Sequence, residues 1–157
     1  MYIPLERRLH VPEVDVTTRI VIDSPPATVA AYAANPLNTT EWYANIKEVT
    51  PHADGPFTVG ARFDFRADFL GRKLIYTYEI VEFDSTRLVM RTSDGPFPME
   101  TTYEWSATGA GSTAMVLRNR GTPSGFFTMA APLMERAMRR ANAKDLAALK
   151  RILETGR

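Results

Sequence analysis

Apolar and polar residues alternate along much of this chain, which is the period of strands that bury one face. Residues 14–22 begin the pattern, with Val14, Val16 and Ile20 separated by charged or hydroxyl side chains. Further alternating stretches follow from residue 46 onward, divided by turns rich in Gly, Pro, Asp and Ser. The pattern predicts an antiparallel meander. Its strands are expected over 61–70, 73–83, 87–92, 98–107 and 113–120.

Two short helical segments are expected between the first strand and the meander. Ser24 precedes a Pro-Pro pair and stands where an N-cap belongs, so a helix over 27–34 is predicted that buries Val29 and Tyr32. An Asn-Pro pair ends this helix. A second short helical or looped stretch then carries Trp42.

A long amphipathic helix is predicted at the C-terminus. Ser124 is the expected cap, and Pro132 is expected to kink or restart the helix near Ala131, because proline removes one backbone hydrogen bond. Gly156 stands where a helix stop belongs. The apolar positions that recur at helical spacing are Met134, Met138, Ala141, Leu146, Leu149, Ile152 and Leu153.

The predicted fold is a single α+β domain, in which a curved antiparallel sheet of six to seven strands wraps around the long C-terminal helix. A length of 157 residues suits one core, and the apolar fraction of 45% and charged fraction of 24% are typical of a globular protein. Residues 14–157 are assigned to this domain and residues 1–13 to an N-terminal extension.

The side chains in the inward rows of the predicted strands are large, whereas the helix that faces them has small residues. Ala137, Ala141 and Ala148 lie on that helix. Small residues opposite large ones leave room, so we expect an apolar cavity. The aromatic and aliphatic residues that share a strand parity are Phe63, Phe65 and Phe69; Tyr76, Tyr78 and Ile80; Leu88 and Met90; and Met99, Tyr103 and Trp105.

Several local motifs occur in an order that is typical of one superfamily. They are Ser24-Pro25-Pro26, Glu41-Trp42, Val59-Gly60, the run 78–83, Gly95-Pro96-Phe97, Asp145-Leu146, Leu149-Lys150 and Leu153-Glu154. In this order the chain resembles the START-like SRPBCC superfamily, in its polyketide cyclase/dehydrase branch, over residues 14–153. The resemblance implies the helix-grip fold and a hydrophobic ligand. It assigns no catalytic residue, because no invariant catalytic motif spans the superfamily.

We select the lining candidates from the inward rows and the helices that face them. For any one of these residues the alternative is an ordinary place in the core. The resemblance places Trp42 near the mouth of the cavity. The candidates are Tyr32, Trp42, Phe65, Tyr78, Met99, Tyr103, Met134 and Met138.

Asn119 is a polar residue in an apolar row. It shares a parity with Met115 and Leu117 in the last strand. A buried amide without a partner costs roughly 1 to 3 kcal/mol. Asn119 therefore needs either a protein partner or a ligand, and we include it among the ligand-binding candidates.

The remaining polar groups offer weaker candidates. Tyr78 and Tyr103 have hydroxyls that suit either a ligand carbonyl or a backbone partner. Asp64 is predicted to be solvated on the convex face. Glu79 has the same outward parity, but a bulge in its strand would turn it inward as a catalytic carboxylate.

The sequence gives little support for thiolate, zinc, cofactor or nucleic-acid chemistry. Without cysteine there is no thiolate site, and the two histidines, His10 and His52, lack the carboxylate cluster of a zinc site. No cofactor motif is present. A net charge of +1 predicts no nucleic-acid partner. We interpret one basic stripe of the C-terminal helix as a solvated face. It consists of Arg136, Arg140 and Lys144, and the acidic residues Glu135, Asp145 and Glu154 balance its charge.

Three functions remain open at this stage. The first is reversible binding of a polyketide, lipid or aromatic metabolite. The second is a cyclase or dehydratase in which Tyr78, Tyr103 or Asn119 stabilises an enolate. The third is a protein-interaction module like the chaperone activators of this fold. With no apolar run of membrane length and a charged N-terminus, a cytoplasmic location without membrane insertion is expected. An oligomer is not indicated.

Overall fold

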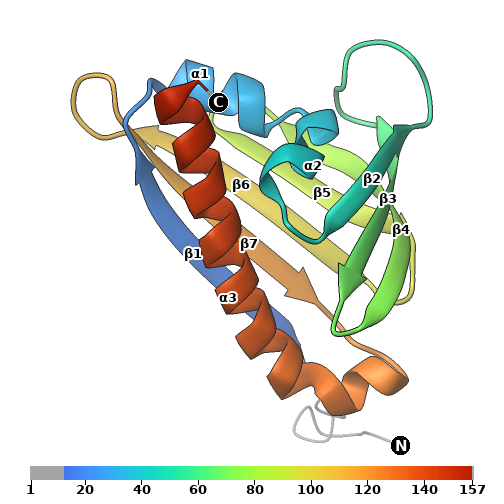
Figure 1. The fold of residues 1–157 in the computed structure, drawn as a ribbon. Helices are drawn as coiled ribbons and strands as arrows, with labels where there is room; N and C mark the ends of the chain where they lie inside the picture. Colours follow the sequence, from blue (N-terminus) through green and yellow to red (C-terminus); the bar gives the residue numbers. More distant parts are fainter. Residues whose placement is uncertain (1–12, 157) are drawn as a thin grey trace, which may run out of the picture.

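The computed structural model describes residues 13–156, and Figure 1 shows a curved sheet with one long helix lying across it. The predicted fold class is confirmed. The short helices follow the first strand, and the chain ends in the long helix. The elements are β1 (Val14–Ile22), α1 (Pro26–Ala33), the 3₁₀ turn η2 (Pro36–Asn38), α2 (Thr39–Trp42), β2 (Ile46–Pro51), β3 (Arg62–Phe69), β4 (Arg72–Phe83), β5 (Arg87–Asp94), β6 (Met99–Ala107), β7 (Thr113–Gly121) and α3 (Phe126–Thr155).

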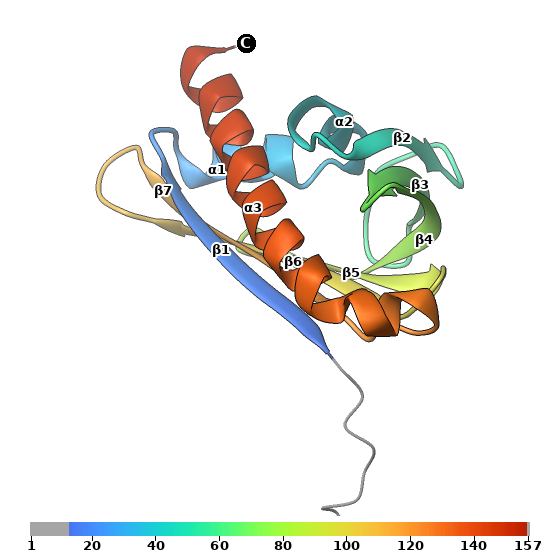
Figure 2. The same ribbon diagram turned by 60° about the horizontal axis from the view of Figure 1, so that its bottom comes forward.

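All seven strands form one antiparallel sheet in the order β1-β7-β6-β5-β4-β3-β2. The strands from β2 to β7 each pair with the next one in sequence, whereas β1 pairs with β7. The first strand of the chain therefore lies beside the last. Figure 2 shows the sheet curling around α3, with α1 and α2 beside the C-terminal part of that helix. A curved sheet that holds one helix is the helix-grip arrangement.

The register of β3, β4, β6 and β7 decides which side chains meet inside the curve. Phe65 pairs with Tyr76 across β3 and β4, and Thr101 pairs with Asn119 across β6 and β7. Two register shifts occur in β4, after Thr77 and after Ile80. Neither shift turns Glu79 inward, since its carboxylate accepts a 2.8 Å hydrogen bond from Arg62 on the outer face.

The helix caps differ by one residue from those predicted. Pro25, not Ser24, is the N-cap of α1, and the carbonyl of Ser24 instead accepts a 2.7 Å hydrogen bond from the Thr113 hydroxyl. Gly125, not Ser124, is the N-cap of α3 at a φ of 59°, which suits a residue without a Cβ. Gly156 ends α3 in the left-handed region, as predicted.

Pro132 bends α3 without dividing it. The helix is continuous from Phe126 to Thr155, so the restart that the sequence allows does not occur. Figure 1 shows its first turns set at an angle to the rest. A single missing N–H so close to the N-terminus interrupts one hydrogen bond of a long helix, which suffices for a bend.

The core consists of two apolar clusters. The larger one joins α1, α2 and the C-terminal part of α3 to the sheet, and it includes Trp42, Ile80 and Leu149. The smaller one lies at the other end of the sheet around Phe97 and Met134. Tyr76 and Met99 pack against both clusters, and the space between the clusters is the candidate site described below.

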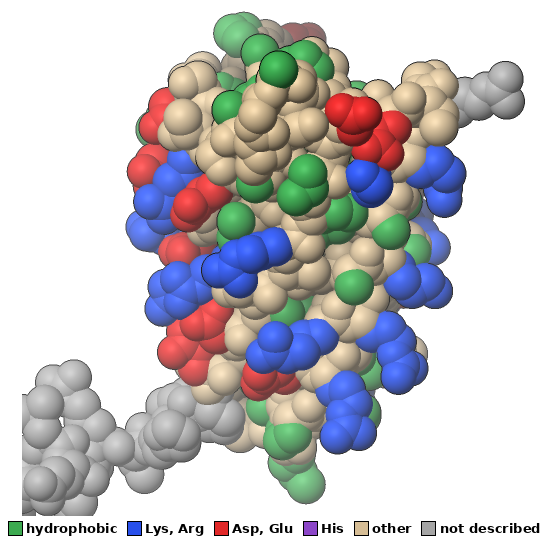
Figure 3. All heavy atoms as spheres, turned by 90° about the vertical axis from the view of Figure 1, so that its left-hand side faces the viewer, with side chains coloured by type: hydrophobic (Ala, Val, Ile, Leu, Met, Phe, Trp, Pro, Cys, Tyr) green, Lys and Arg blue, Asp and Glu red, His purple; other side chains and the backbone are tan. Residues whose placement is uncertain are grey.

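The outer side of α3 is basic. Arg136, Arg140 and Lys144 are exposed, as predicted, and Figure 3 shows Lys and Arg side chains spread over this side of the molecule. Asp145 does not join them, although the sequence places it with the solvated residues. Asp145 is only 2% exposed, because it lies on the opposite, inward face of the helix. None of the helices in residues 13–156 is long and apolar enough to cross a membrane.

Candidate ligand-binding site

A cavity of about 130 Å³ lies between the concave face of the sheet and the middle of α3. Most of its wall comes from β3, β4, β6, β7, the loop between α2 and β2, and α3. Exposed Asp68 is among the lining residues, so the cavity borders solvent at the end of β3. Small Ala141 stands on the helix opposite the large side chains of the sheet.

Most of the wall is apolar. Phe65 stacks on Tyr76 with parallel rings 5.3 Å apart, and Tyr78 meets Phe65 edge-on at 5.5 Å. Met99 and Met134 face these rings from β6 and α3. Thioethers and ring faces of this kind adapt to an apolar guest.

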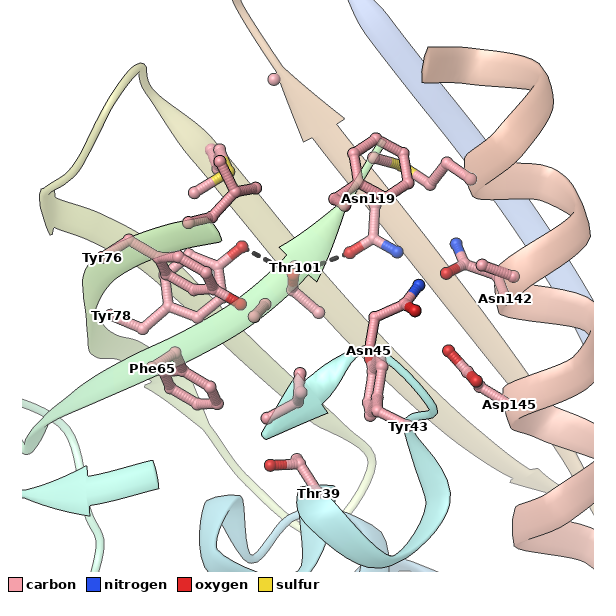
Figure 4. Close-up of a pocket in the computed structure, with 18 of the residues that line it drawn as sticks. Thr39, Tyr43, Asn45, Phe65, Tyr76, Tyr78, Thr101, Asn119, Asn142 and Asp145 are labelled. Atoms are coloured by element: carbon pink, nitrogen blue, oxygen red, sulfur yellow. Dashed lines mark hydrogen bonds between the residues drawn. The ribbon is translucent and has the colours of Figure 1, made fainter. Parts of the chain in front are cut away.

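The other end of the cavity is polar. In Figure 4 the amides of Asn45, Asn119 and Asn142 and the carboxylate of Asp145 point toward one another. They come from the loop before β2, from β7 and from α3. The cavity therefore has one apolar end and one end with converging hydrogen-bonding groups, which is the usual composition of a small-molecule site.

A hydrogen-bond relay fixes the Asn119 amide. The hydroxyl of Thr101 donates to Asn119 Oδ1 at 2.8 Å, and the Tyr78 hydroxyl lies 2.9 Å from the same Thr101 oxygen. Since the single Thr101 proton is already used, Tyr78 is the donor of the second bond. Burial raises the pKa of Tyr78 to about 12, which keeps that proton in place. The carbonyl of Asn119 is thus occupied, and its NH₂ group remains for the cavity.

Two further tyrosines close the polar end. The hydroxyls of Tyr43 and Tyr103 lie 2.7 Å apart. Burial raises the pKa of both side chains well above the usual tyrosine value, so both are neutral. One hydroxyl donates to the other, so only the proton of the donating tyrosine is used within the pair.

Asn142 and Asp145 project into the polar end from one face of α3. Asn142 is 3% exposed, and its Nδ2 has no hydrogen-bond partner among residues 13–156. One Asp145 oxygen accepts a 3.1 Å hydrogen bond from the Ala44 amide. Burial raises the pKa of Asp145 to about 6, against the opposing effects of the Ala44 bond and of Lys144. The carboxyl is therefore mostly ionised at neutral pH.

Seven of the nine predicted ligand-binding residues lie in the cavity wall. Their side chains come from β3, β4, β6, β7 and α3, so the inward parities deduced from the sequence hold. A role in ligand binding stays a prediction for each of them. These seven are Phe65, Tyr78, Met99, Tyr103, Asn119, Met134 and Met138.

Tyr32 and Trp42 lie outside the cavity wall. The Tyr32 hydroxyl bonds to the carboxylate of Glu41 at the surface. Trp42 is 2% exposed and packs against Tyr43 and Tyr103, with ring centroids 4.2 and 5.7 Å away. Trp42 therefore does not line this cavity, because α2 turns the indole into the larger core cluster, and the mouth position that the resemblance assigns to it stays a prediction.

A Trp42→Phe variant is expected to lose about 1 kcal/mol of stability and no affinity for an apolar guest. The smaller ring gives up buried contact, but it also removes an indole N–H that has no partner among residues 13–156. Chemical denaturation measures the stability, and titration with fluorobenzene measures the affinity. If Trp42→Phe kept its stability and lost its affinity for fluorobenzene, Trp42 would be a ligand-binding residue.

The sequence reading missed most of the polar end. Asn142 and Asp145 are polar, yet they follow Met138 at four and seven residues, which keeps them on the inward face of the helix. That spacing was the available signal. Asn45 carried none, because it lies in a loop whose direction depends on the helices before it.

No group of three His, Asp or Glu side chains within residues 13–156 is arranged to hold a metal ion. His52 is exposed and pairs with Asp64 on the outer face at 2.7 Å. His10 lies outside the described residues.

Two comparisons with known proteins agree with this architecture. Residues 13–154 match the family model for polyketide cyclase / dehydrase and lipid transport. A protein of Thermus thermophilus has a TM-score of 0.78 at 18% identity, over 90% of this chain and 98% of its own. A START superfamily protein of Mycobacterium smegmatis has 0.78 at 12% identity, over 91% and 99%.

A third solved structure is the Zhui aromatase/cyclase of a Streptomyces species. Its TM-score is 0.77 at 16% identity, over 90% of this chain and 94% of its own. A comparison with curated proteins finds no match. At these identities the likeness to solved structures establishes the fold alone.

Proposed function

The chain belongs to the polyketide cyclase/dehydrase and lipid transport family of the START-like SRPBCC superfamily, and from that premise we propose that it binds a small hydrophobic molecule between α3 and the sheet. The observation that carries the proposal is the cavity itself, with its aromatic wall and its polar end. A core built only for stability would be filled at this point, because protein interiors are close-packed.

The volume favours a compact guest. An engineered cavity of about 150 Å³ in another protein holds one benzene molecule, and the cavity here measures about 130 Å³. Among a polyketide, a lipid and an aromatic metabolite, a single-ring aromatic molecule fits this conformation best. A longer guest would extend from the cavity toward solvent at Asp68.

A modest affinity follows from the size of such a guest. Burying about 200 Å² of apolar surface gains roughly 5 kcal/mol, from which the costs of association are subtracted. We therefore expect dissociation constants of about 0.2 mM or weaker for a simple aromatic molecule.

Fluorine NMR of fluorobenzene tests the proposal with a probe of the right size. We expect a saturable change of the fluorine signal with one site per chain, reversed by non-fluorinated benzene. Native mass spectrometry of protein from its own host would then look for a retained aromatic molecule. A signal that changes only in proportion to protein concentration, without saturation, contradicts the proposal.

A second candidate function is that of a cyclase or dehydratase. One observation favours it: the buried Asp145 carboxyl, with its pKa raised to about 6, lies at the same end as the amides of Asn119 and Asn142. A base near neutral pH could take the proton next to a carbonyl, while the electron pair moves to the carbonyl oxygen and the amides hold it.

Turnover of a short poly-β-keto substrate separates this second function from binding alone. The enzyme hypothesis predicts product above the spontaneous background and loss of that product in Asp145→Asn. Absence of product rejects it and leaves the binding proposal in place. The interaction-module alternative predicts an interior filled by side chains, so the cavity does not support it.

A further inference from the structure

We propose that the polar end of the cavity selects a guest with a neutral carbonyl oxygen, in preference to a hydrocarbon or a carboxylate. The inference rests on the proposed binding function and adds to it the chemical class of the guest. It comes from two amide groups that present donors, a relay that orients one of them, and the charge of the surrounding side chains.

Asn142 supplies the first donor. Its Nδ2 is buried and has no partner among residues 13–156, although Asn142 lines a cavity large enough for a guest. A buried donor without an acceptor costs free energy, and an acceptor placed in the cavity would remove that cost. The geometry therefore calls for an oxygen with free lone pairs.

Asn119 supplies the second donor. If its amide could rotate freely, the cavity would offer an acceptor and a donor equally. The hydroxyl of Thr101 prevents this, because it donates to Asn119 Oδ1 and is itself held by Tyr78. The relay leaves the NH₂ of Asn119 facing Asn142, as Figure 4 shows. Asn119 and Asn142 thus present their amide groups to the same polar end of the cavity.

The charges near this place exclude an anion. A carboxylate guest would meet the largely ionised Asp145 in a buried site. Because little water is present there to screen the charges, two carboxylates repel each other strongly. Among residues 13–156, Arg120 is the one basic residue in the cavity wall. Its guanidinium is engaged outside, 3.1 Å from Glu13 and 3.9 Å from Glu100. No counter-charge is therefore available to the carboxylate.

A neutral carbonyl oxygen has two lone pairs and can accept from both amides at once, whereas an ammonium group has no lone pair and leaves both amides unsatisfied.

Three probes of nearly equal shape test the inference on the full-length protein: acetophenone, isopropylbenzene and benzoate. Each is titrated against fluorobenzene by fluorine NMR at pH 7.5. We expect acetophenone to bind about tenfold more tightly than isopropylbenzene, which corresponds to one buried donor satisfied, and benzoate to bind most weakly. Equal binding of the ketone and the hydrocarbon, or preferred binding of benzoate, overturns the inference alone. Failure of all three to bind overturns the proposed function as well.

Two variants locate the effect. Asn142→Leu replaces the amide by an apolar group of similar size and is expected to abolish the preference for acetophenone, while isopropylbenzene binds at least as well as before. Thr101→Val keeps the shape but breaks the relay, and it is expected to reduce the preference severalfold. Should Asn142→Leu not fold, Thr101→Val still decides the matter. A full ketone preference in a folded Asn142→Leu or in Thr101→Val contradicts the assignment.

Discussion

Replacing Ala141 by phenylalanine is expected to abolish fluorobenzene binding, with an affinity at least about a hundredfold weaker because the guest loses its whole transfer free energy. Ala141 lines the cavity from the middle of α3, opposite the aromatic rows of the sheet. A phenyl group at this position occupies the place of the guest. Its own burial offsets the strain of inserting it, so stability should change by no more than about 1 to 3 kcal/mol.

Ala147→Phe is the matched control. Ala147 lies on the exposed side of the same helix, so the substitution has the same helix propensity cost and leaves the cavity empty. Fluorine NMR compares the two variants, and chemical denaturation verifies that both are folded. Binding of fluorobenzene by Ala141→Phe with the parental affinity would show that the probe binds elsewhere.

Asp145→Asn is expected to stabilise the protein by about 1 to 3 kcal/mol at pH 8. Burial raises the pKa of this carboxyl from its ordinary value of 3.8 to about 6 in the folded chain, and each unit of difference is worth 1.36 kcal/mol. The folded state therefore binds this proton more tightly than the unfolded state. Stability contributed by the protonated group is present below about pH 4 and is lost as the pH rises through 6. Asparagine keeps an acceptor for Ala44 without the buried charge.

The measurement is the free energy of unfolding of both proteins between pH 4 and pH 8. The difference between them should be small at pH 4 and reach its full size above pH 6. Other carboxylates, such as Asp15 and Asp64, have lowered pKa values and titrate in both proteins alike, so they cancel. Asp54→Asn in an exposed turn is the control. A constant difference across the range, or a less stable Asp145→Asn at pH 8, contradicts the assignment of a buried charge.

The sheet could be predicted from the sequence because its side chains alternate. Once Phe65, Tyr78 and Asn119 are assigned to the inward row of their strands, their place in the wall follows from the period of two. The position of Tyr32 and Trp42 could not be predicted in the same way. Helices of eight and four residues contain too few turns to show which face is inward.

The polar end of the cavity is a tertiary feature. Asp145 stands next to Lys144 in the sequence, which favours a surface interpretation, but a step of one residue turns a helix by about 100°. That step carries Asp145 from the basic side to the cavity. Its approach to Asn45 and Asn119 depends on the curl of the sheet and on the loop before β2, which no local pattern specifies.

A crystal structure of the protein with acetophenone bound tests the cavity and its selectivity together. The predicted result is a phenyl ring between Phe65 and Met134, with the carbonyl oxygen within hydrogen-bonding distance of Asn142 Nδ2. Side chains that fill the space between α3 and the sheet, with the ketone bound on the surface or not at all, would contradict it.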